Sequence, residues 1–366
     1  MNPHPPLRLA VVGCGVIGRL HAELAAHSPD LHVAALIDPS SAATTAVAEH
    51  LHRLGAPPPR VHTDLTTALA DGGIDIVVIC TLSGTHAQLG LEALEAGLHV
   101  VIEKPLDVDV AAARHLRDAA AQRPGQVIAV ISQHRHDPSA RAVRRALDAR
   151  RFGRITSAVA NTDWFRSQEY YDSAAWRGTW ALDGGALMNQ GVHTLDLLLW
   201  FLGEPVDVTA HTARLAHERI EVEDVAVAIL RFEDGALATL HATTAAYPDL
   251  GVRLQIHGTD GSAVIARDEL TFFHTRDAED IDGDQVTREL AELNGGPGNS
   301  HQAQWTDIVT AIREGRTPLV DVDAGFLALT TVRAVYLSAT LGRTIRVADV
   351  ADGKYDGQAT RTGSQT

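Results

Sequence analysis

The sequence predicts an α/β protein: an N-terminal domain with a doubly wound parallel sheet, then an α+β domain with a large, open, mostly antiparallel sheet. Two observations indicate this. Over residues 1–132, short apolar runs alternate with helical stretches, an order typical of parallel βαβ units. Beyond residue 132, longer runs follow one another with little helix between them, which is typical of an antiparallel sheet with one covered face. We expect domains at 1–132 and 133–350, and a disordered tail at 351–366.

The first domain is expected to consist of strands separated by helices. Ile74–Cys80 is a continuous run rich in Ile and Val, as expected of a parallel strand covered on both faces. The other predicted strands are Leu9–Val12, Val33–Ile37, Arg60–Thr63, Leu98–Ile102 and Val127–Ile131. The predicted helices are Leu20–Ala26, Ala42–Leu54, Leu65–Ala70, His86–Ala96 and Val110–Gln122.

The second domain is expected to combine one sheet with several helices. Its predicted strands are Ile155–Phe165, Val206–Leu215, Val225–Phe232, Leu237–Thr244, Val252–His257 and Ser262–Ile265, and its predicted helices are Arg141–Ala149, Gly185–Leu202, Gln302–Glu314 and Ala324–Leu341. The apolar strands Val225–Leu230 and Leu237–Thr243 have an outer face that needs a cover. We therefore expect a homodimer or homotetramer that is joined through this sheet.

Composition excludes several classes of protein. The chain has 366 residues, 45% of them apolar, and a formal charge of −15, whereas a nucleic-acid partner requires a basic face. Its two cysteines, Cys14 and Cys80, fall in or beside apolar runs, so we expect no disulfide and a cytoplasmic location. The N-terminus does not read as a signal peptide, and the longest strongly apolar stretch, Leu197–Leu202, is far shorter than the ~20 residues of a membrane span.

Residues 13–18 read G-x-G-x-x-G, directly after the first predicted strand and at the start of a helix. Gly13 allows the tight turn, Gly15 lets backbone N–H groups approach a pyrophosphate, and Gly18 lets the helix lie close to the strand. Val16 and Ile17 complete the loop, at a helix N-terminus that favours an anion. The pattern predicts a dinucleotide-binding Rossmann domain. The alternative is a glycine turn in another kind of α/β protein.

Asp38 supports the first interpretation. It ends the second predicted strand, about 20 residues past Gly18, where an acidic side chain can accept hydrogen bonds from the adenosine ribose hydroxyls. A carboxylate there would also repel a 2′-phosphate. We therefore expect NAD rather than NADP as the cofactor.

Several further motifs resemble those of the Gfo/Idh/MocA family, the glucose–fructose oxidoreductase and inositol dehydrogenase group. The likeness spans about residues 7–347. It is carried by Gly13–Gly18, His86, Glu103-Lys104-Pro105, the Trp176–Trp180 segment WRGTW, the Asp183–Asp196 segment DGGALMNQGVHTLD, and Pro318-Leu319-Val320. The resemblance implies a Rossmann domain followed by an open-sheet domain, a bound nicotinamide cofactor, and oxidation or reduction of a sugar or cyclitol.

Lys104 follows the predicted strand Leu98–Ile102, and ligands of doubly wound sheets lie outside the carboxyl ends of strands. In the family the matching lysine contacts the reacting hydroxyl, and an ammonium there can stabilise an alkoxide. Glu103 is expected to hold the cofactor or the lysine, and Pro105 to follow a cis peptide bond. The alternative is a surface Glu-Lys pair before a turn.

His193 is the expected proton acceptor, because its ordinary pKa is near neutrality. Asn189 precedes it by four residues and would share its face of a helix. Many family members have Asp at this position. Asn cannot take a proton, so we expect Asn189 to orient substrate. Asp196, on the same side, could assist. The alternative for His193, one of 19 histidines, is a core or surface histidine.

Other candidates are expected near the cleft or the nicotinamide. Trp176 and Arg177 are expected to flank nicotinamide and substrate, although an ordinary buried Trp beside a surface Arg fits nearly as well. Gln133, Arg135 and His136 lie where the first domain ends, and His301 and Gln302 follow a Gly/Asn-rich loop. The expected cofactor-binding residues are Gly13, Gly15, Val16, Ile17, Gly18, Asp38, Thr81, Ser83, His86, Glu103, Lys104, Trp176 and Arg177. The expected substrate-binding residues are Lys104, Arg135, Arg177, Asn189 and His193.

The sequence thus favours an NAD-dependent oxidoreductase acting on a CH–OH group of a sugar, sugar derivative or inositol, with Lys104, His193 and Asn189 as catalytic residues. No H-E-x-x-H or C-x-x-C motif is present, so no metal site is expected. A keto-sugar reductase and a glycosidase that oxidises its substrate transiently with NAD remain alternatives. So does a non-catalytic NAD-binding regulator, although the presence of both Lys104 and His193 argues against it.

Overall fold

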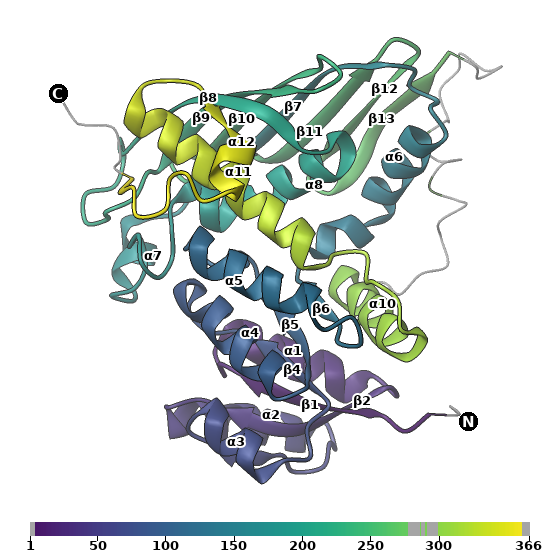
Figure 1. Cartoon of the computed structure of the whole chain (residues 1–366), viewed down its shortest axis with the longest axis vertical. Coiled ribbons are helices and arrows are strands. Elements are labelled where there is room, and N and C mark those ends of the chain that lie inside the picture. The colour runs from purple at the N-terminus through teal and green to yellow at the C-terminus, as the bar shows by residue number, and fades with distance from the viewer. Residues whose placement is uncertain (1–3, 277–285, 287–289, 291–298, 361–366) are drawn as a thin grey trace. The chain divides into compact units, whose positions relative to one another are not determined.

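The computed structural model describes residues 4–276, 286, 290 and 299–360 (Figure 1). The chain packs into two compact units. The first comprises Met1–Ile131 and Gln304–Gly325, and the second comprises Ser132–Ala303 and Phe326–Thr366. The sequence places 304–325 within the second domain. In the structure they pack in the first unit, because an apolar stripe of α10 covers its sheet.

The first unit contains a six-stranded parallel sheet in the order β3-β2-β1-β4-β5-β6. This confirms the predicted doubly wound sheet. Its strands are β1 Leu7–Val12, β2 Leu31–Ile37, β3 Arg60–His62, β4 Ile76–Ile79, β5 His99–Ile102 and β6 Ile128–Val130. Its helices are α1 Val16–His27, α2 Ser41–Arg53, α3 Leu65–Asp71, η1 Ser83–Thr85, α4 His86–Glu95, α5 Val110–Ala121 and α10 Ser300–Glu314. Side-chain N-caps define the starts of three of them, through Ser40, Asp64 and Asp109.

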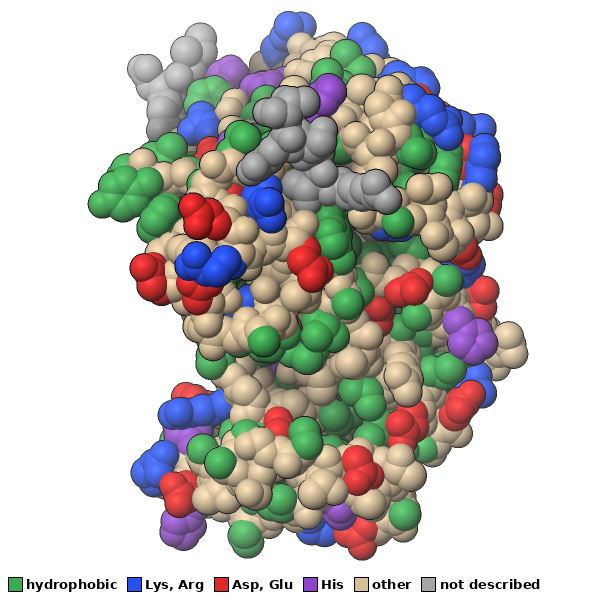
Figure 2. Space-filling view, turned by 90° about the vertical axis from the view of Figure 1, so that its left-hand side faces the viewer, with side chains coloured by type: hydrophobic (Ala, Val, Ile, Leu, Met, Phe, Trp, Pro, Cys, Tyr) green, Lys and Arg blue, Asp and Glu red, His purple; other side chains and the backbone are tan. Residues whose placement is uncertain are grey.

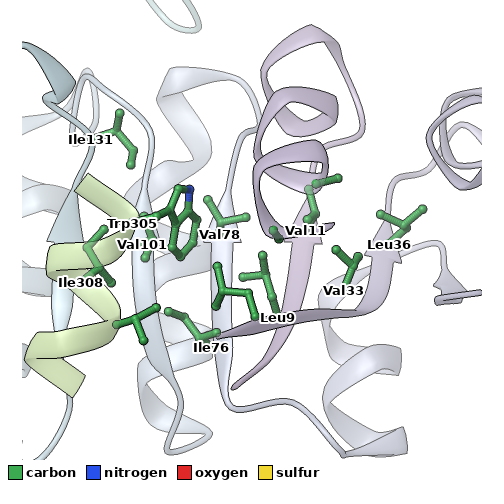
Figure 3. Packing of buried hydrophobic residues seen from close by; sticks show 14 of the residues in the cluster. Leu9, Val11, Val33, Leu36, Ile76, Val78, Val101, Ile131, Trp305 and Ile308 are labelled. Atoms are coloured by element: carbon green, nitrogen blue, oxygen red, sulfur yellow. The ribbon is translucent and has the colours of Figure 1, made fainter. Parts of the chain in front are cut away.

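One face of this sheet packs against α1, α2 and α10. Figure 3 shows Leu9, Val11, Ile76 and Val78 pointing from β1 and β4 toward Trp305 and its neighbours on α10. Strand β4 is fully buried, as the apolar run Ile74–Cys80 predicts. A helix late in the chain therefore completes the core that the first 131 residues begin.

The second unit contains an eight-stranded sheet in the order β13-β12-β11-β7-β10-β9-β8-β14. Its strands are β7 Ile155–Asp163, β8 Pro205–Ala213, β9 Val225–Phe232, β10 Leu237–Thr243, β11 Gly251–Gly258, β12 Gly261–Ala266, β13 Glu269–Thr275 and β14 Ile345–Arg346. Neighbouring strands are antiparallel except β7 and β10, so the sheet is mostly antiparallel, as predicted. The sequence did not predict the edge strands β13 and β14. β14 has only two residues, too few for a pattern.

Helices cover one face of the second sheet. They are η2 Gln133–His136, α6 Pro138–Asp148, α7 Gln168–Asp172, η3 Ala186–Gly191, α8 Val192–Leu202, α11 Val322–Leu341 and α12 Val347–Ala351. The predicted helix Gly185–Leu202 is divided: η3 is a π-helix that leads into α8. Small side chains allow η3 to lie close to the sheet, since a Cβ on Gly191 would lie 2.6 Å from that of Ala242.

The C-terminal residues differ from the predicted disordered tail. Residues 352–357 form turns after α12. Arg333 on α11 donates hydrogen bonds to the Thr360 hydroxyl, at 2.6 Å, and to the Gln358 carbonyl. These contacts attach residues 351–360 to the second unit. The segment has few apolar side chains, so its sequence does not indicate that it packs against the fold. Residues 361–366 lie outside the described residues.

Helix α11 is long and apolar enough to cross a membrane, with a mean hydropathy of 1.4 over its best window. In the structure, 67% of that window is buried within the protein. Tyr336, Leu337 and Val332 are among the least exposed side chains of the chain. A buried core helix has this composition too, and α11 from Phe326 onward belongs to the second unit.

Charge is dispersed over the surface. On the face drawn in Figure 2, acidic and basic side chains are scattered among polar and apolar ones. The acidic groups do not gather into a single patch there. With 46 acidic and 31 basic residues, the net charge is therefore carried broadly on that face.

Candidate active site

The glycine loop joins β1 to α1. Gly13 has a φ of +91°, and a Cβ there would lie 2.6 Å from the Cys80 carbonyl oxygen. A Cβ on Gly18 would lie 1.8 Å from the Gly13 carbonyl oxygen, so both positions require glycine. A Cβ on Gly15 would meet no atom within 4 Å. The loop therefore leaves open space beside Gly15, which fits the close approach of a pyrophosphate.

The first turn of α1 is suited to an anion. Gly15 occupies the N-cap position and offers no side chain to the first N–H groups of the helix. Val16 is 86% exposed and Ile17 41% exposed, although both are apolar. Exposed apolar side chains at an uncapped helix N-terminus fit a site where a ligand covers them.

Asp38 lies directly after β2, beside the same loop. Its carboxylate accepts a hydrogen bond from the Cys14 N–H at 2.8 Å and another from the Ser40 N–H at 2.8 Å. The two bonds fix the carboxylate next to the glycine loop. This is the position that recognition of an adenosine ribose requires.

The segment after β4 contains the next predicted residues. Ser83 begins the short helix η1, and the Thr81 hydroxyl lies 2.8 Å from that of Thr85. His86 is buried, and its two ring nitrogens lie 2.8 Å from the Pro105 carbonyl oxygen and 3.2 Å from that of Thr81. His86 therefore ties two segments together. Its predicted contact with the cofactor stays a prediction, and in the structure its ring is enclosed and both nitrogens have carbonyl partners.

Glu103 is held by a buried chain of hydrogen bonds. The Trp305 indole N–H donates to His21 Nδ1 at 2.9 Å, so His21 Nε2 carries the proton that is donated to Glu103 Oε1 at 2.8 Å. The other oxygen, Oε2, accepts the Lys104 N–H at 3.0 Å. The Lys104–Pro105 peptide bond is cis, as predicted. Glu103 therefore fixes the backbone from which the Lys104 side chain leaves the sheet.

Asn189 and His193 lie in the second unit, on η3 and α8. Asn189 Nδ2 donates a hydrogen bond to Asp183 Oδ1, and Asp183 Oδ2 accepts the Gly178 N–H at 2.7 Å. The π-helical turn ends between the two residues, at Gly191. The common face predicted from α-helical spacing therefore does not apply, because a π-helix has a different number of residues per turn.

His193 lines a pocket in the second unit. The other lining residues are His134, Trp164, Thr194, Leu197, Val252, Leu254, Ile265 and Asp268. They come from η2, α8 and the strands of one half of the sheet. A mostly apolar pocket with a few polar groups is typical of a small-molecule site.

His134 faces His193 across this pocket. The ring centroids are 5.3 Å apart and the planes are nearly perpendicular, at 87°. His134 Nδ1 donates to Asp137 at 2.8 Å and lies 3.6 Å from Asp268. Burial by itself would lower the pKa of His134, but the bond to Asp137 and the nearby carboxylates outweigh it and raise that pKa. A histidine that favours the cationic form therefore borders the pocket.

Among the described residues, His134, Asp137 and Asp268 place ligand atoms within 4.8 Å of one another. A metal ion would need the lone pair of His134 Nδ1, which carries the proton donated to Asp137. These residues therefore form a hydrogen-bonded histidine–carboxylate pair with a second carboxylate nearby.

Arg135, a predicted substrate-binding residue, has a carboxylate and an aromatic partner within the second unit. Its guanidinium forms a bidentate ion pair with Asp196, at 2.8 and 2.7 Å, and lies 5.6 Å from the Trp200 ring. Both side chains are 6% exposed. The Ser132 hydroxyl also donates to Asp196. Arg135 is therefore occupied in holding η2 against α8. For the same reason Asp196 is not free to assist His193.

The remaining candidates lie in three places. Gln133 and His136 belong to η2, and His301 and Gln302 to the first turn of α10. Arg177 stacks between Tyr170 and Trp176, at 4.2 and 4.4 Å from the two ring centroids.

Comparisons with known proteins agree with this architecture. The model of the oxidoreductase family with an NAD-binding Rossmann fold matches residues 7–131, and that of the GFO/IDH/MocA C-terminal domain matches residues 140–264. The chain belongs to the GFO/IDH/MocA family. It is therefore an oxidoreductase whose N-terminal domain binds NAD, and its family includes dehydrogenases of sugars and inositol.

Three GFO/IDH/MocA proteins illustrate the similarity. The inositol 2-dehydrogenase of Rhizobium meliloti is 30% identical over 263 residues, which are 70% of this chain and 74% of the relative. The WlbA dehydrogenase of Bordetella pertussis, solved with NADH and UDP-GlcNAcA, has a TM-score of 0.84 and 31% identity over 93% of this chain and 98% of that one. The Chromobacterium violaceum WlbA dehydrogenase, solved with the same ligands, has a TM-score of 0.83 and 34% identity over 94% and 99%.

Sequence reasoning missed several residues of this GFO/IDH/MocA site. His21 and Trp305, which hold Glu103, are 284 positions apart, and neither lies in a recognisable motif. His134 lies next to predicted candidates, but its position facing His193 depends on tertiary packing. Tyr170 contacts Arg177, and Arg166 contacts Trp164 and Tyr170. The sequence offered one signal for these two residues, which is that they lie close to the WRGTW segment.

Proposed function

We propose that this protein is an NAD-dependent dehydrogenase that oxidises a hydroxyl-bearing carbon of a sugar, sugar derivative or inositol. The observation that carries the proposal is His193 in a pocket of the second unit, beside an aromatic ring and apolar side chains. A sugar has apolar C–H faces and polar edges, which suit such a lining. The names of the relatives, inositol 2-dehydrogenase and a dehydrogenase solved with a nucleotide sugar, support the same reaction class.

In the proposed reaction, His193 and Lys104 have different roles toward one C–OH group. A ring nitrogen of His193 takes the hydroxyl proton as general base. The Lys104 ammonium stabilises the negative charge that develops on the oxygen while the C=O bond forms. NAD, when bound, accepts the hydride that leaves the same carbon. Asn189, held by Asp183, orients the substrate and takes no proton.

Two substitutions test the assignment. Lys104→Ala should lower kcat about a hundredfold or more, because it removes one preorganised contact to the oxyanion. His193→Ala should lower kcat about 10²–10⁴-fold through loss of the general base, and flatten the acid limb of the pH–rate profile. Asn189→Ala should have a smaller effect. NADH absorbance with a panel of polyols, free sugars and nucleotide sugars provides the measurement.

Cofactor affinity is the control in these experiments. Each variant should bind NAD within about threefold of the parent, since the glycine loop is unchanged. The proposal fails if both Lys104→Ala and His193→Ala turn over within threefold of the parent. Stoichiometric NADH formation separates a dehydrogenase from a glycosidase that regenerates its cofactor, and reversal of the assay with NADH and a keto-sugar identifies a reductase.

A further inference from the structure

Five planar side chains form an alternating stack in the second unit. The Arg166 guanidinium lies 5.1 Å from the Trp164 ring centroid and 5.5 Å from that of Tyr170. Arg177 lies 4.2 Å from the Tyr170 centroid and 4.4 Å from that of Trp176. The order is therefore Trp, Arg, Tyr, Arg, Trp. We call these residues the arginine–aromatic stack.

The two arginines of the stack keep their charge available. In the part of the chain that the structure describes, neither forms an ion pair with a carboxylate. Arg166 donates to the Phe165 carbonyl at 2.9 Å, and Arg177 to the Tyr170 hydroxyl at 2.6 Å and the Ser173 hydroxyl at 3.2 Å. A guanidinium has five N–H donors, so each retains others. Nearby Arg219, in contrast, forms a bidentate pair with Asp172.

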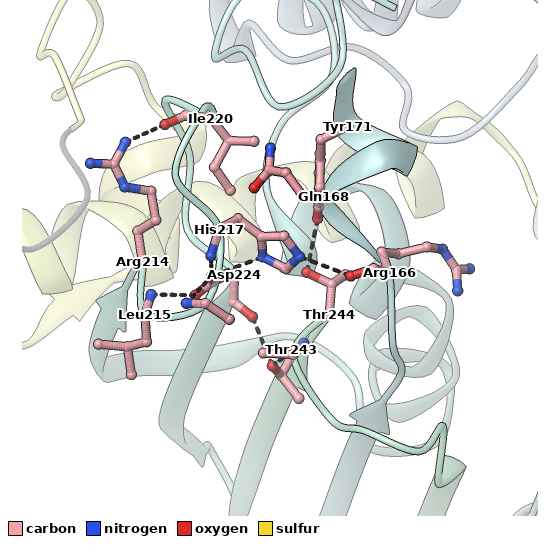
Figure 4. Close-up of polar contacts among 12 residues, drawn as sticks. Arg166, Gln168, Tyr171, Arg214, Leu215, His217, Ile220, Asp224, Thr243 and Thr244 are labelled. Carbon is pink, nitrogen blue, oxygen red and sulfur yellow. Dashed lines mark hydrogen bonds and ion pairs between the residues drawn. The ribbon is translucent and has the colours of Figure 1, made fainter. Parts of the chain in front are cut away.

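The backbone of Arg166 is anchored by a buried ion pair, which Figure 4 shows. His217 Nδ1 lies 2.9 Å from an Asp224 carboxylate oxygen, and Nε2 lies 2.8 Å from the Arg166 carbonyl oxygen. Both partners only accept, so both ring nitrogens donate and the imidazole is cationic. Burial acts against that charge, but these hydrogen bonds outweigh it and raise the pKa of His217.

Further bonds complete the anchor. The Arg166 N–H donates to the Thr244 carbonyl at 2.8 Å. Asp224 also accepts the backbone N–H groups of Leu215, Ala216 and His217, which fixes the loop that carries the imidazole. In Figure 4 the Arg166 guanidinium points away from this cluster. The protein thus fixes the base of a cation while leaving its charged end unpaired, an arrangement suited to binding an anion without reorganisation.

The stack adjoins the pocket that contains His193. Trp164, at its end, lines that pocket. Tyr170, at its centre, has its hydroxyl 3.5 Å from Gln190 Nε2, and Gln190 lies on the helical segment that leads into His193. A ligand group bound on the stack would therefore belong to a molecule whose other end enters the pocket.

We propose that the arginine–aromatic stack binds the anionic part of the substrate, so that the substrate is a sugar carrying phosphate or carboxylate oxygens. This rests on the proposed dehydrogenase function. Guanidinium edges match phosphate and carboxylate oxygens with paired hydrogen bonds. The stacked rings hold the guanidinium planes, which lowers the entropy lost on binding. Two unpaired cations in succession suit a diphosphate or a pair of separate anionic groups.

The test compares Arg166→Met and Arg177→Met with a matched control, Arg219→Met. Each removes one positive charge and keeps an unbranched side chain, but Arg219 is exposed and already paired with Asp172. Loss of a hydrogen bond to a charged group predicts an increase of about 10–100-fold in KM for UDP-GlcNAcA, with kcat changed less than threefold. The control should stay within twofold. KM for an uncharged sugar or polyol should not change in Arg166→Met or in the control.

Three ligands distinguish the source of the anionic oxygens. UDP-GlcNAcA carries a diphosphate and a carboxylate, its counterpart without the uronic carboxyl carries only the diphosphate, and the free uronic sugar carries only the carboxylate. An effect of Arg166→Met confined to the first two ligands assigns the diphosphate. An effect confined to the first and third assigns the carboxylate. Either result supports the proposal.

Binding of UDP alone, measured by calorimetry, keeps this inference separate from the reaction. Weaker UDP binding by Arg166→Met supports the anion site even if no sugar is oxidised, a result that would overturn the dehydrogenase proposal only. The salt dependence of KM in the unaltered protein needs no variant: KM for UDP-GlcNAcA should rise with salt while that for an uncharged substrate does not. The inference is overturned if neither arginine variant changes affinity for UDP or any anionic sugar by more than twofold.

Discussion

The Asp38 carboxylate has one orientation because two backbone N–H groups, those of Cys14 and Ser40, donate to it. A fixed carboxylate recognises a vicinal diol well, since both hydroxyls can donate to its free lone pairs. It also excludes a phosphate by charge repulsion. At the scale of single residues, we therefore expect the choice of cofactor to depend on this carboxylate, whose position the N–H groups of Cys14 and Ser40 fix.

This geometry predicts a strong preference for NAD over NADP. Asp38→Ala should lower kcat/KM with NAD about tenfold or more, because hydrogen bonds to a charged group are lost, and should narrow the preference. Asp71→Ala, which removes an exposed carboxylate of the same unit, should leave kcat/KM with NAD and the preference for NAD over NADP unchanged. Steady-state kinetics with both cofactors measure the effect. Equal efficiency of the unaltered protein with NADP would contradict the prediction.

At the scale of elements, the π-helical segment η3 depends on a buried carboxyl group. Glu223 accepts the Leu187 N–H at 2.9 Å and the Tyr336 hydroxyl at 3.0 Å, and the same hydroxyl accepts the Met188 N–H at 3.2 Å. A Cβ on Gly185 would lie 1.6 Å from Glu223 Oε2. The backbone of η3, the segment that leads into His193, therefore packs closely against the Glu223 carboxyl group.

Glu223 should make stability depend on pH. Burial raises the pKa of Glu223 to about 8, from 4.5. Between these values the folded protein retains a proton that the unfolded chain loses, so the free energy of unfolding should fall as pH rises from about 5 to 8, by roughly 3–5 kcal/mol. Glu223→Gln keeps the two accepted hydrogen bonds and removes this dependence.

Urea unfolding at pH 5, 6.5 and 8 measures the effect. The difference in unfolding free energy between Glu223→Gln and the unaltered protein should favour the variant increasingly as pH rises, since other titrating groups cancel in the comparison. A difference that stays constant over this range would show that Glu223 is ionised in the folded protein.

At the scale of the whole molecule, the outer face of the second sheet carries exposed apolar side chains. Val227, Ile229 and Leu237 are 48%, 55% and 50% exposed, and they lie on the paired strands β9 and β10. Apolar side chains grouped on an open sheet face are typical of an interface. We propose that a second copy of the chain covers this face in a homodimer or homotetramer.

A charge placed on this face should separate the copies. Ile229→Glu should shift the mass measured by light scattering at micromolar concentration toward the monomer, because burying a carboxylate in an apolar interface is costly. Val61→Glu is the matched control, since Val61 is also an apolar strand residue, 54% exposed, in the first unit. A monomeric mass for the unaltered protein would contradict the proposal.

The sequence predicted most of the fold because its signals are local. The run Ile74–Cys80 could only be a buried strand, and the spacing from Gly18 to Asp38 identified a nucleotide site. The contacts that the sequence did not indicate depend on partners distant in the chain. From the sequence alone, Arg135 is as compatible with binding a substrate as with pairing to a buried carboxylate. Folding then places Asp196 beside it. Helix α10 shows an apolar stripe, but the stripe does not specify which sheet it covers.

The sequence by itself therefore determined the fold class and the NAD-binding loop, since both follow from residue type and short spacing. The family resemblance added Lys104 and His193 as candidate catalytic residues. Only the tertiary structure decided how those residues are supported. Glu103 is bonded to His21, His193 faces a His134 that favours the cationic form, and Arg166 is anchored by His217. The physical reason is that hydrogen bonds and ion pairs join whichever groups folding brings within about 3 Å, whatever their separation along the chain.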